Sequence, residues 1–239
     1  MAEKEVVVIT GGGTGIGAAA AVELASLGMN VVVVGRRPAP LNEIVERITK
    51  AGGTAVAHPA DISDYAAMEE LVQATLSRFR KIDLLIPNAA LHDASDIDIG
   101  DPYWWHSVID VNVVGLLFTV RAFLPQMIQQ GKGHIMVISS LSGRLTYVGE
   151  PIYITSKHAQ VAFVECLRKE VTPKGIKVSI IEPGMVETPF IDNIFARELK
   201  KTVPPLEAED VARAIRFVYE QPENCTIYEI SMRPKKQLL

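Results

Sequence analysis

Tyr153 and Lys157 stand four residues apart in the sequence YITSK, and together they have the chemistry of a proton-transfer pair. If this segment is helical, both side chains lie on the same face. A tyrosine pKa near 10 must fall by about 3 units for proton exchange at neutral pH, which requires about 4 kcal/mol. One ammonium about 4 Å away, at an effective dielectric near 20, supplies about that much. The pair is therefore a candidate general acid/base, although two unrelated residues on a helix surface would show the same spacing.

A glycine-rich turn at residues 11–17 (GGGTGIG) directly follows the apolar run 6–9. Glycine permits a sharp turn and a close approach of the backbone to a ligand, and the N-terminus of the next helix attracts an anion. Glycines also mark ordinary turns, but a strand before and a helix after are the context of a dinucleotide site. We therefore predict that a pyrophosphate is bound by Gly11, Gly13, Thr14, Gly15, Ile16 and Gly17.

Apolar runs alternate with segments of helical periodicity from one end of the chain to the other. We expect strands at 6–9, 30–34, 54–58, 82–86, 133–138, 177–181 and 226–230. We expect helices from about 15 to 22, from 40 to 51, from an N-cap at Ser63 to 79, and at 102–130, 153–171 and 207–219. This order predicts one α/β domain over residues 1–239, a doubly wound Rossmann fold with a mostly seven-stranded parallel sheet flanked by helices.

The composition is that of an ordinary globular protein, with 48% hydrophobic and 22% charged residues among 239. A net charge of −4 argues against nucleic acid or an anionic membrane as the main partner. The charged start MAEKE leads into a strand, and no apolar run approaches the roughly 18–20 residues that span a bilayer. Cys166 and Cys225 form neither a disulfide framework nor a metal-ligand spacing. We therefore expect packed thiols, no bound metal and a cytoplasmic location.

The second expected strand ends at Gly35, Arg36 and Arg37, where NAD-binding folds place an acidic residue for the adenosine ribose. Glycine removes the carboxylate that would repel a 2′-phosphate, and an arginine fork can bind that phosphate bidentately. The pattern favours NADP(H), with Arg36 as the main contact and Arg37 able to share it, although both could be solvated loop residues. Thr14 could add a hydroxyl contact to the same phosphate.

Two further strand ends could hold the rest of the nucleotide. Asp61 and Ile62 follow the third strand, where the carboxylate could accept from the adenine amino group or simply cap a helix. Asn88 and Ala89 follow the fourth strand, where small residues would let the backbone pass beneath a ribose.

These motifs together resemble the short-chain dehydrogenase/reductase family over nearly the whole chain. The family's glycine turn matches residues 10–17, its Asn-Asn-Ala-Gly segment stands as PNAA at 87–90, and its PGxVxT segment spans 183–188. The departures at Pro87 and Ala90 should matter little. The family's adenine aspartate matches Asp61, and its catalytic tetrad matches Asn112, Ser140, Tyr153 and Lys157.

The resemblance implies a role for each member of the tetrad. Ser140 would hold the substrate oxygen. It is chosen over Ser139 because it lies thirteen residues before the tyrosine, the family's usual separation. Tyr153 would exchange a proton with that oxygen while a hydride passes between the nicotinamide and the carbon. Lys157 would lower the tyrosine pKa and bind the nicotinamide ribose. Asn112 would interrupt helix bonding and support a water that relays protons to Lys157, unless it only satisfies a neighbour.

The family resemblance also bears on the C-terminal third of the chain. Contacts to the nicotinamide carboxamide are implied for Pro183, Gly184, Val186 and Thr188. The sequence YEISMRP stands in place of the usual Asp-Gly-Gly ending. It is similar to the ending of some NADP-dependent reductases, hydroxy-acid dehydrogenases among them.

The substrate pocket is the part that the sequence defines least. Candidate lining residues, each of which could instead be ordinary packing or surface, are His92, Leu141, Tyr147, Ile152 and Phe190. A substrate loop is expected at about 188–205, with a mobile-looking segment at 191–203.

Assembly is suggested by the adjacent Trp104 and Trp105, which cannot both face one core. We therefore expect one of them at a subunit interface. The family pairs the helices that carry Asn112 and Tyr153 across a two-fold axis, which implies a homodimer or homotetramer.

The sequence thus predicts an NADP(H)-dependent oxidoreductase that interconverts a small-molecule carbonyl and an alcohol, the substrate being a ketone, an aldehyde or a 3-hydroxy acid. A non-catalytic NADP(H)-binding sensor or regulator is the alternative from another class, but a sensor has no need of the serine, tyrosine and lysine together. A sugar-nucleotide epimerase or dehydratase would need a larger substrate domain than the residues after Thr188 provide.

Overall fold

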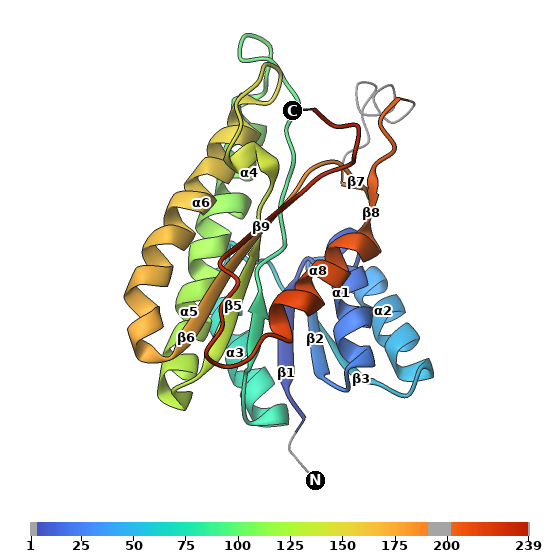
Figure 1. Cartoon of the computed structure of the whole chain (residues 1–239), viewed down its shortest axis with the longest axis vertical. Helices are drawn as coiled ribbons and strands as arrows, with labels where there is room; N and C mark the ends of the chain where they lie inside the picture. Colours follow the sequence, from blue (N-terminus) through green and yellow to red (C-terminus); the bar gives the residue numbers. More distant parts are fainter. Residues whose placement is uncertain (1–3, 191–201, 239) are drawn as a thin grey trace.

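Apolar runs rich in Val, Ile and Leu form the main sheet, whose strands pair in parallel in the order β3-β2-β1-β4-β5-β6-β9. The computed structural model describes residues 4–190 and 202–238, and this part of the chain contains a seven-stranded parallel sheet (Figure 1). The strands are β1 (Val6–Thr10), β2 (Asn30–Gly35), β3 (Thr54–Pro59), β4 (Leu84–Ile86), β5 (Gly133–Ile138), β6 (Ile176–Pro183) and β9 (Glu229–Met232). The predicted Rossmann fold is confirmed.

Helices cover both faces of the sheet, because successive residues of a strand point to opposite sides. One face, which includes Val7 and Ile9, packs against α1 (Gly15–Ser26), α2 (Pro38–Lys50) and α8 (Ala208–Tyr219). The other face, which includes Val8 and Leu85, packs against α3 (Tyr65–Phe79), α5 (Leu116–Gln130) and α6 (Pro151–Val171). Figure 1 shows these layers, with the sheet between the two groups of helices.

The strand order reverses at β1, which has β2 on one side and β4 on the other. In an open α/β sheet, such a reversal leaves a crevice at the carboxyl ends of the strands, and ligands bind there. The glycine turn follows β1, Asn88 follows β4, and Ser140 follows β5. The predicted site residues therefore converge on one edge of the sheet.

Residues 102–130 form a long helical rod made of α4 (Pro102–Ile109), a π turn (Asp110–Gly115) and α5. By length and composition alone, this rod is long and apolar enough to cross a membrane. From the sequence we expected no such stretch. Its Leu116, Val120 and Phe123 are buried in the core cluster between α5 and the sheet. Packing inside the fold therefore accounts for the apolar residues on this face.

Several boundaries differ from those predicted. Helix α3 begins after Asp64, whose carboxylate accepts from the Ala67 N–H at 3.2 Å, so the prediction of Ser63 as the N-cap is wrong. The last strand covers 229–232 rather than 226–230, and β4 begins at Leu84 rather than at residue 82. A short parallel pair, β7 (Val186–Glu187) and β8 (Leu206–Glu207), had no sequence signal.

The two cysteines also depart from expectation. Cys166 and Cys225 are both free and exposed, so the prediction of packed thiols is wrong. Cys166 lies on the outer side of α6, and Cys225 lies in the segment between α8 and β9. The exposure of the two cysteines could not be predicted from the sequence, because each lies near apolar residues that do pack inside the fold.

Candidate active site

Tyr153 lies in the first turn of α6, which begins at Pro151, a residue suited to the start of a helix because it has no N–H to satisfy. Its side chain is only 6% exposed. Burial is the largest effect and raises the pKa of Tyr153 above its ordinary value, while the nearby Ser140 side chain lowers it in part. The net shift is upward, so the prediction that Lys157 lowers the pKa of Tyr153 is not borne out here. Ser140 ends β5 and its Oγ accepts from the Ser142 N–H at 3.1 Å. The fold thus brings the predicted serine and tyrosine into contact.

Lys157 lies one helical turn after Tyr153 and is 2% exposed. Its Nζ is 5.5 Å from the centroid of the Tyr153 ring, close enough for an attractive cation–π contact. Burial lowers the pKa of Lys157 from 10.5 to about 7. Nζ also donates to Gln160 Oε1 at 3.1 Å, a contact that the sequence analysis missed although the i to i+3 spacing could have indicated it.

Asn112 is fully buried in the π turn between α4 and α5. Its Oδ1 accepts from the Leu91 N–H at 2.7 Å, and its Nδ2 donates to the Leu91 carbonyl at 2.8 Å and to Ser156 Oγ at 3.0 Å. The side chain therefore fastens the segment after β4 to the helical rod and to α6. Both interpretations of Asn112 apply in part, since the helix bonding departs from the α pattern here and the amide satisfies neighbours.

The glycine turn after β1 is tightly enclosed. Gly11 has φ +65°, and a Cβ added to it would lie 2.8 Å from Asn88 Nδ2. A Cβ on Gly17 would overlap the Gly11 carbonyl oxygen and lie 2.6 Å from the same amide. At the start of α1, Thr14 makes no side-chain capping bond, and the first turn contains no acidic residue. The backbone N–H groups there are thus open to an anion, as the binding of a pyrophosphate requires.

Asn88 holds this turn in place from the end of β4. Its Nδ2 donates to the carbonyls of Thr10 at 2.9 Å and Gly11 at 3.2 Å. In return, Thr10 Oγ1 accepts the N–H groups of Asn88 at 3.0 Å and Ala89 at 3.1 Å. Asn88 and Ala89 therefore connect two neighbouring strand ends at the edge where a ribose is predicted to lie.

Arg36 and Arg37 are exposed at the end of β2. The Gly12 N–H donates to the Val34 carbonyl at 3.1 Å, which places this strand end beside the glycine turn. The two guanidinium groups are thus available to a phosphate, and their exposure is equally what solvated loop residues would show.

Asp61 follows β3, and its Oδ1 accepts both the N–H of Ser63 at 3.0 Å and its hydroxyl at 2.8 Å. This local turn orients the carboxylate. Ile62 is buried, and a Cβ on Gly115 would lie 2.7 Å from its side chain, so Ile62 packs against the π turn.

The PGxVxT segment folds back toward the glycine turn after β6. Pro183 ends that strand, the Gly184 N–H donates to the Met232 carbonyl at 2.7 Å, and Val186 begins β7. A Cβ added to Gly15 would lie 3.0 Å from the Thr188 methyl, so the end of this segment touches the phosphate turn. This is the arrangement that a contact of both segments with one cofactor requires.

A polar wall, defined as His92, Glu150, Tyr147 and Ser142, lies beside Tyr153. The His92 ring is 4.7 Å from the Tyr153 ring between centroids, and His92 Nε2 is 3.2 Å from Glu150 Oε1. Tyr147 Oη donates to Glu150 Oε2 at 2.8 Å and lies 2.6 Å from Ser142 Oγ. His92 and Tyr147 were predicted near the pocket, whereas Glu150 and Ser142 carried no recognisable signal.

The other pocket candidates are partly placed. The Phe190 ring is 6.2 Å from the Tyr153 ring and 5.8 Å from the His92 ring. Leu141 is buried and Ile152 half-buried. Most of the predicted mobile segment, residues 191–201, lies outside the described residues.

The two adjacent tryptophans face different surroundings. Trp104 is 41% exposed and donates from Nε1 to the His92 carbonyl at 3.2 Å. Trp105 donates from Nε1 to Ser95 Oγ at 3.2 Å. Trp104 is therefore the one with surface to offer a partner.

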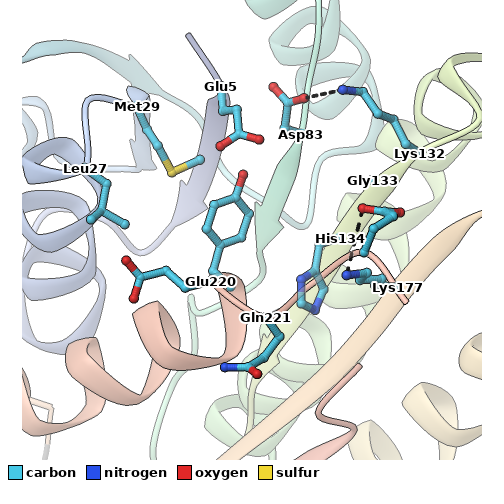
Figure 2. A pocket seen from close by; sticks show the side chains of 12 residues that line it. Glu5, Leu27, Met29, Asp83, Lys132, Gly133, His134, Lys177, Glu220 and Gln221 are labelled. Atoms are coloured by element: carbon cyan, nitrogen blue, oxygen red, sulfur yellow. Dashed lines mark ion pairs between the residues drawn. The ribbon is translucent and has the colours of Figure 1, made fainter. Parts of the chain in front are cut away.

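A separate cavity of about 600 Å³ lies at the opposite, amino edge of the sheet (Figure 2). Its wall includes Glu5 before β1, Asp83 before β4 and His134 in β5. Lys132 pairs with Asp83 at 3.7 Å, and burial lowers the pKa of His134 to about 4. None of the predicted catalytic residues lines this cavity, which leaves the carboxyl edge as the candidate site.

Comparison with known proteins agrees with this geometry. Residues 5–199 match the family model described as short chain dehydrogenase. The chain is 36% identical over 233 residues to a protein of Staphylococcus saprophyticus named as an uncharacterized oxidoreductase, covering 97% of this chain and 98% of that one.

Two similar solved structures carry NADP or a derivative in their descriptions. The closed form of serine dehydrogenase complexed with NADP+ has a TM-score of 0.91 and 29% identity, covering 97% of this chain and 96% of that one. An alcohol dehydrogenase from Thermococcus sibiricus complexed with 5-hydroxy-NADP has a TM-score of 0.89 and 26% identity, covering 98% of each chain. The fold, the converging motifs and these matches lead to one conclusion: the chain belongs to the short chain dehydrogenase family of oxidoreductases.

Proposed function

We propose that the protein is an NADP(H)-dependent oxidoreductase that interconverts a carbonyl compound and an alcohol. One observation carries the proposal. The Tyr153 phenol is buried, its pKa is lowered in part by the Ser140 side chain, and the Lys157 ammonium lies 5.5 Å from its ring centroid. A nicotinamide bound at this edge would supply or accept the hydride.

The three side chains divide the remaining work. Ser140 donates a hydrogen bond to the substrate oxygen and so holds it beside the phenol. Tyr153 gives its proton to that oxygen in reduction and takes a proton from the alcohol in oxidation. Lys157 stabilises the resulting tyrosinate. At 5.5 Å and an effective dielectric near 20, one ammonium contributes about 3 kcal/mol, or about two pH units, against the cost of burying the anion.

The preference for NADP(H) over NAD(H) rests on the end of β2. No acidic residue stands there, and Arg36 and Arg37 are exposed beside the glycine turn. Arg36 would bind the 2′-phosphate, with Thr14 and Arg37 as further contacts. Asp61 and Ile62 would hold the adenine, and Asn88 and Ala89 the ribose side.

The substrate class follows from what lies beside Tyr153. The polar wall offers hydroxyl groups, a carboxylate and an imidazole. Such a wall suits a small carbonyl or alcohol with a second polar group, above all one that donates hydrogen bonds, whereas the Glu150 carboxylate would repel the carboxylate of a 3-hydroxy acid placed beside it. A sensor that never turned over would gain nothing from a buried tyrosine and lysine whose desolvation costs stability.

Two further properties belong to the proposal. We place the protein in the cytoplasm and expect a homodimer or homotetramer, with the half-exposed Trp104 at a subunit contact. Size-exclusion chromatography with light scattering tests this, and a species of only 26.1 kDa would contradict it.

The test of activity is a screen of ketones, aldehydes, 3-hydroxy acids and sugars for oxidation of NADPH or reduction of NADP+. On any substrate found, Tyr153→Phe should lower kcat/KM by about 10²–10⁴-fold and leave NADPH binding unchanged. Tyr219→Phe, at the opposite edge of the sheet, is the matched control. Activity of Tyr153→Phe equal to that of the wild type would remove the phenol from the mechanism.

A further inference from the structure

Gln160 joins two members of the tetrad that do not otherwise meet. It lies in α6 one turn after Lys157 and is 3% exposed. Its Oε1 accepts from Lys157 Nζ at 3.1 Å, and its Nε2 donates to the Asn112 carbonyl at 2.7 Å. Both ends of one buried amide are therefore used, each in the direction that its chemistry allows.

The π turn places the Asn112 carbonyl where this amide can reach it. In a π turn the hydrogen bonds of the helix run from residue i to i+5 instead of i+4, which redirects the carbonyls of that turn. The Asn112 side chain is already committed to Leu91 and Ser156. Its main-chain oxygen also faces α6, and it accepts a hydrogen bond from the Gln160 amide.

We propose that Gln160 is a positioning residue that ties the Lys157 ammonium to the Asn112 carbonyl through its side-chain amide. The family resemblance assigns this link to a water. An amide orients its donor and acceptor permanently and does not take up or release protons near neutral pH. This bridge therefore fixes the ammonium and does not itself carry protons away from it.

The surroundings of Lys157 explain why one neutral acceptor matters. Tyr153 is the titratable neighbour from α6, and the groups that face the ammonium through this bridge are the uncharged Gln160 and Asn112. Within residues 4–190 and 202–238, no carboxylate forms an ion pair with Lys157 that would hold its charge. A hydrogen bond accepted from a charged group favours the charged form, so loss of the Gln160 oxygen should destabilise the ammonium further.

The direct test is a titration of the Lys157 side-chain nitrogen by NMR in the cofactor-free protein, with ¹⁵N-labelled lysine and assignment by the missing signal in Lys157→Met. Gln160→Met should lower the midpoint of Lys157 by about one pH unit, because it keeps the volume and removes the acceptor. Val164→Ala, one turn further along α6 and buried in the core, controls for a general loosening of the helix. Its midpoint should match that of the wild type.

A second variant keeps the proposal open to refutation if Gln160→Met does not fold. Gln160→Glu retains an oxygen at the ammonium and adds charge, so it should raise the midpoint of Lys157, the opposite direction. A merely structural Gln160 would lower the melting temperature in both variants and leave the midpoint where it is. That outcome overturns the proposal.

The catalytic consequence rests on the proposed function, whereas the titration does not. With a substrate in hand, Gln160→Met should shift the tyrosine-dependent limb of the pH profile of kcat/KM to higher pH. If no carbonyl substrate is turned over but the NMR midpoints move as expected, the proposed function fails and the role of Gln160 stands. If activity is found and the NMR midpoints do not move, the proposed function stands and the role of Gln160 fails.

Discussion

Replacing Lys157 by methionine should make the protein more stable while it removes activity. The ammonium is 2% exposed, and its burial lowers the pKa from 10.5 to about 7. At about 1.36 kcal/mol per pH unit, this difference of 3.5 units means that the charged side chain costs the fold about 5 kcal/mol. Methionine fills similar space without a charge. It leaves Gln160 Oε1 without its donor, which costs about 1–3 kcal/mol, so the net gain should be about 2–4 kcal/mol.

The sign of the pH dependence follows from the lowered pKa. The folded protein resists protonation of Lys157, so the penalty is fully present below pH 7, where the lysine is charged in both states. The penalty decreases as the pH rises from about 7 toward 10.5, because the folded state then holds a neutral amine while the lysine in the unfolded state is still protonated. The advantage of Lys157→Met should therefore be largest near pH 6 and shrink toward pH 10.

Urea unfolding of the wild type and Lys157→Met at pH 6, 8 and 9.5 measures this difference directly. Leu167→Ala, another buried change on α6 that should only destabilise, provides the control. The reasoning is refuted if Lys157→Met is no more stable than the wild type at pH 6. It is also refuted if the difference does not change with pH.

Two further predictions concern the cofactor edge. Arg36→Ala should weaken NADPH binding by about 10–100-fold and NADH binding by much less, since only NADPH presents a 2′-phosphate. Fluorescence titration of both cofactors measures this, and equal losses for the two would remove Arg36 from phosphate recognition. Gly17→Ala should lower the free energy of unfolding by more than about 1 kcal/mol, because its methyl would overlap the Gly11 carbonyl and lie 2.6 Å from Asn88 Nδ2. Gly35→Ala is the control: its Cβ would lie 3.6 Å from Leu41, so it should cost much less in the same denaturation assay.

The sequence was sufficient for the sheet because a parallel strand buried on both faces leaves a continuous apolar run. Strand β5 was predicted at its observed bounds of 133–138. Boundaries failed where neighbours compete. Ser63 and Asp64 are both good capping residues, and the carboxylate of Asp64 takes the role while Ser63 donates to Asp61.

The catalytic residues could be predicted because their chemistry is tied to fixed spacings and strand ends. Two members of the polar wall could not be predicted, because Ser142 lies in a short 3-10 turn (Leu141–Gly143) and Glu150 just before α6, and their positions beside Tyr153 depend on tertiary packing. Gln160 was missed for another reason. A glutamine within a helix usually faces solvent. Its spacing from Lys157 pointed to one partner, but only the π turn opposite presents the Asn112 carbonyl as the other.

A crystal structure with NADP+ tests the central claim most directly. We predict that the nicotinamide ring lies within reach of the Tyr153 phenol oxygen, with the Lys157 ammonium on the nicotinamide ribose and the 2′-phosphate against Arg36. A ring held away from the phenol, or a lysine turned out of the site, would contradict the account.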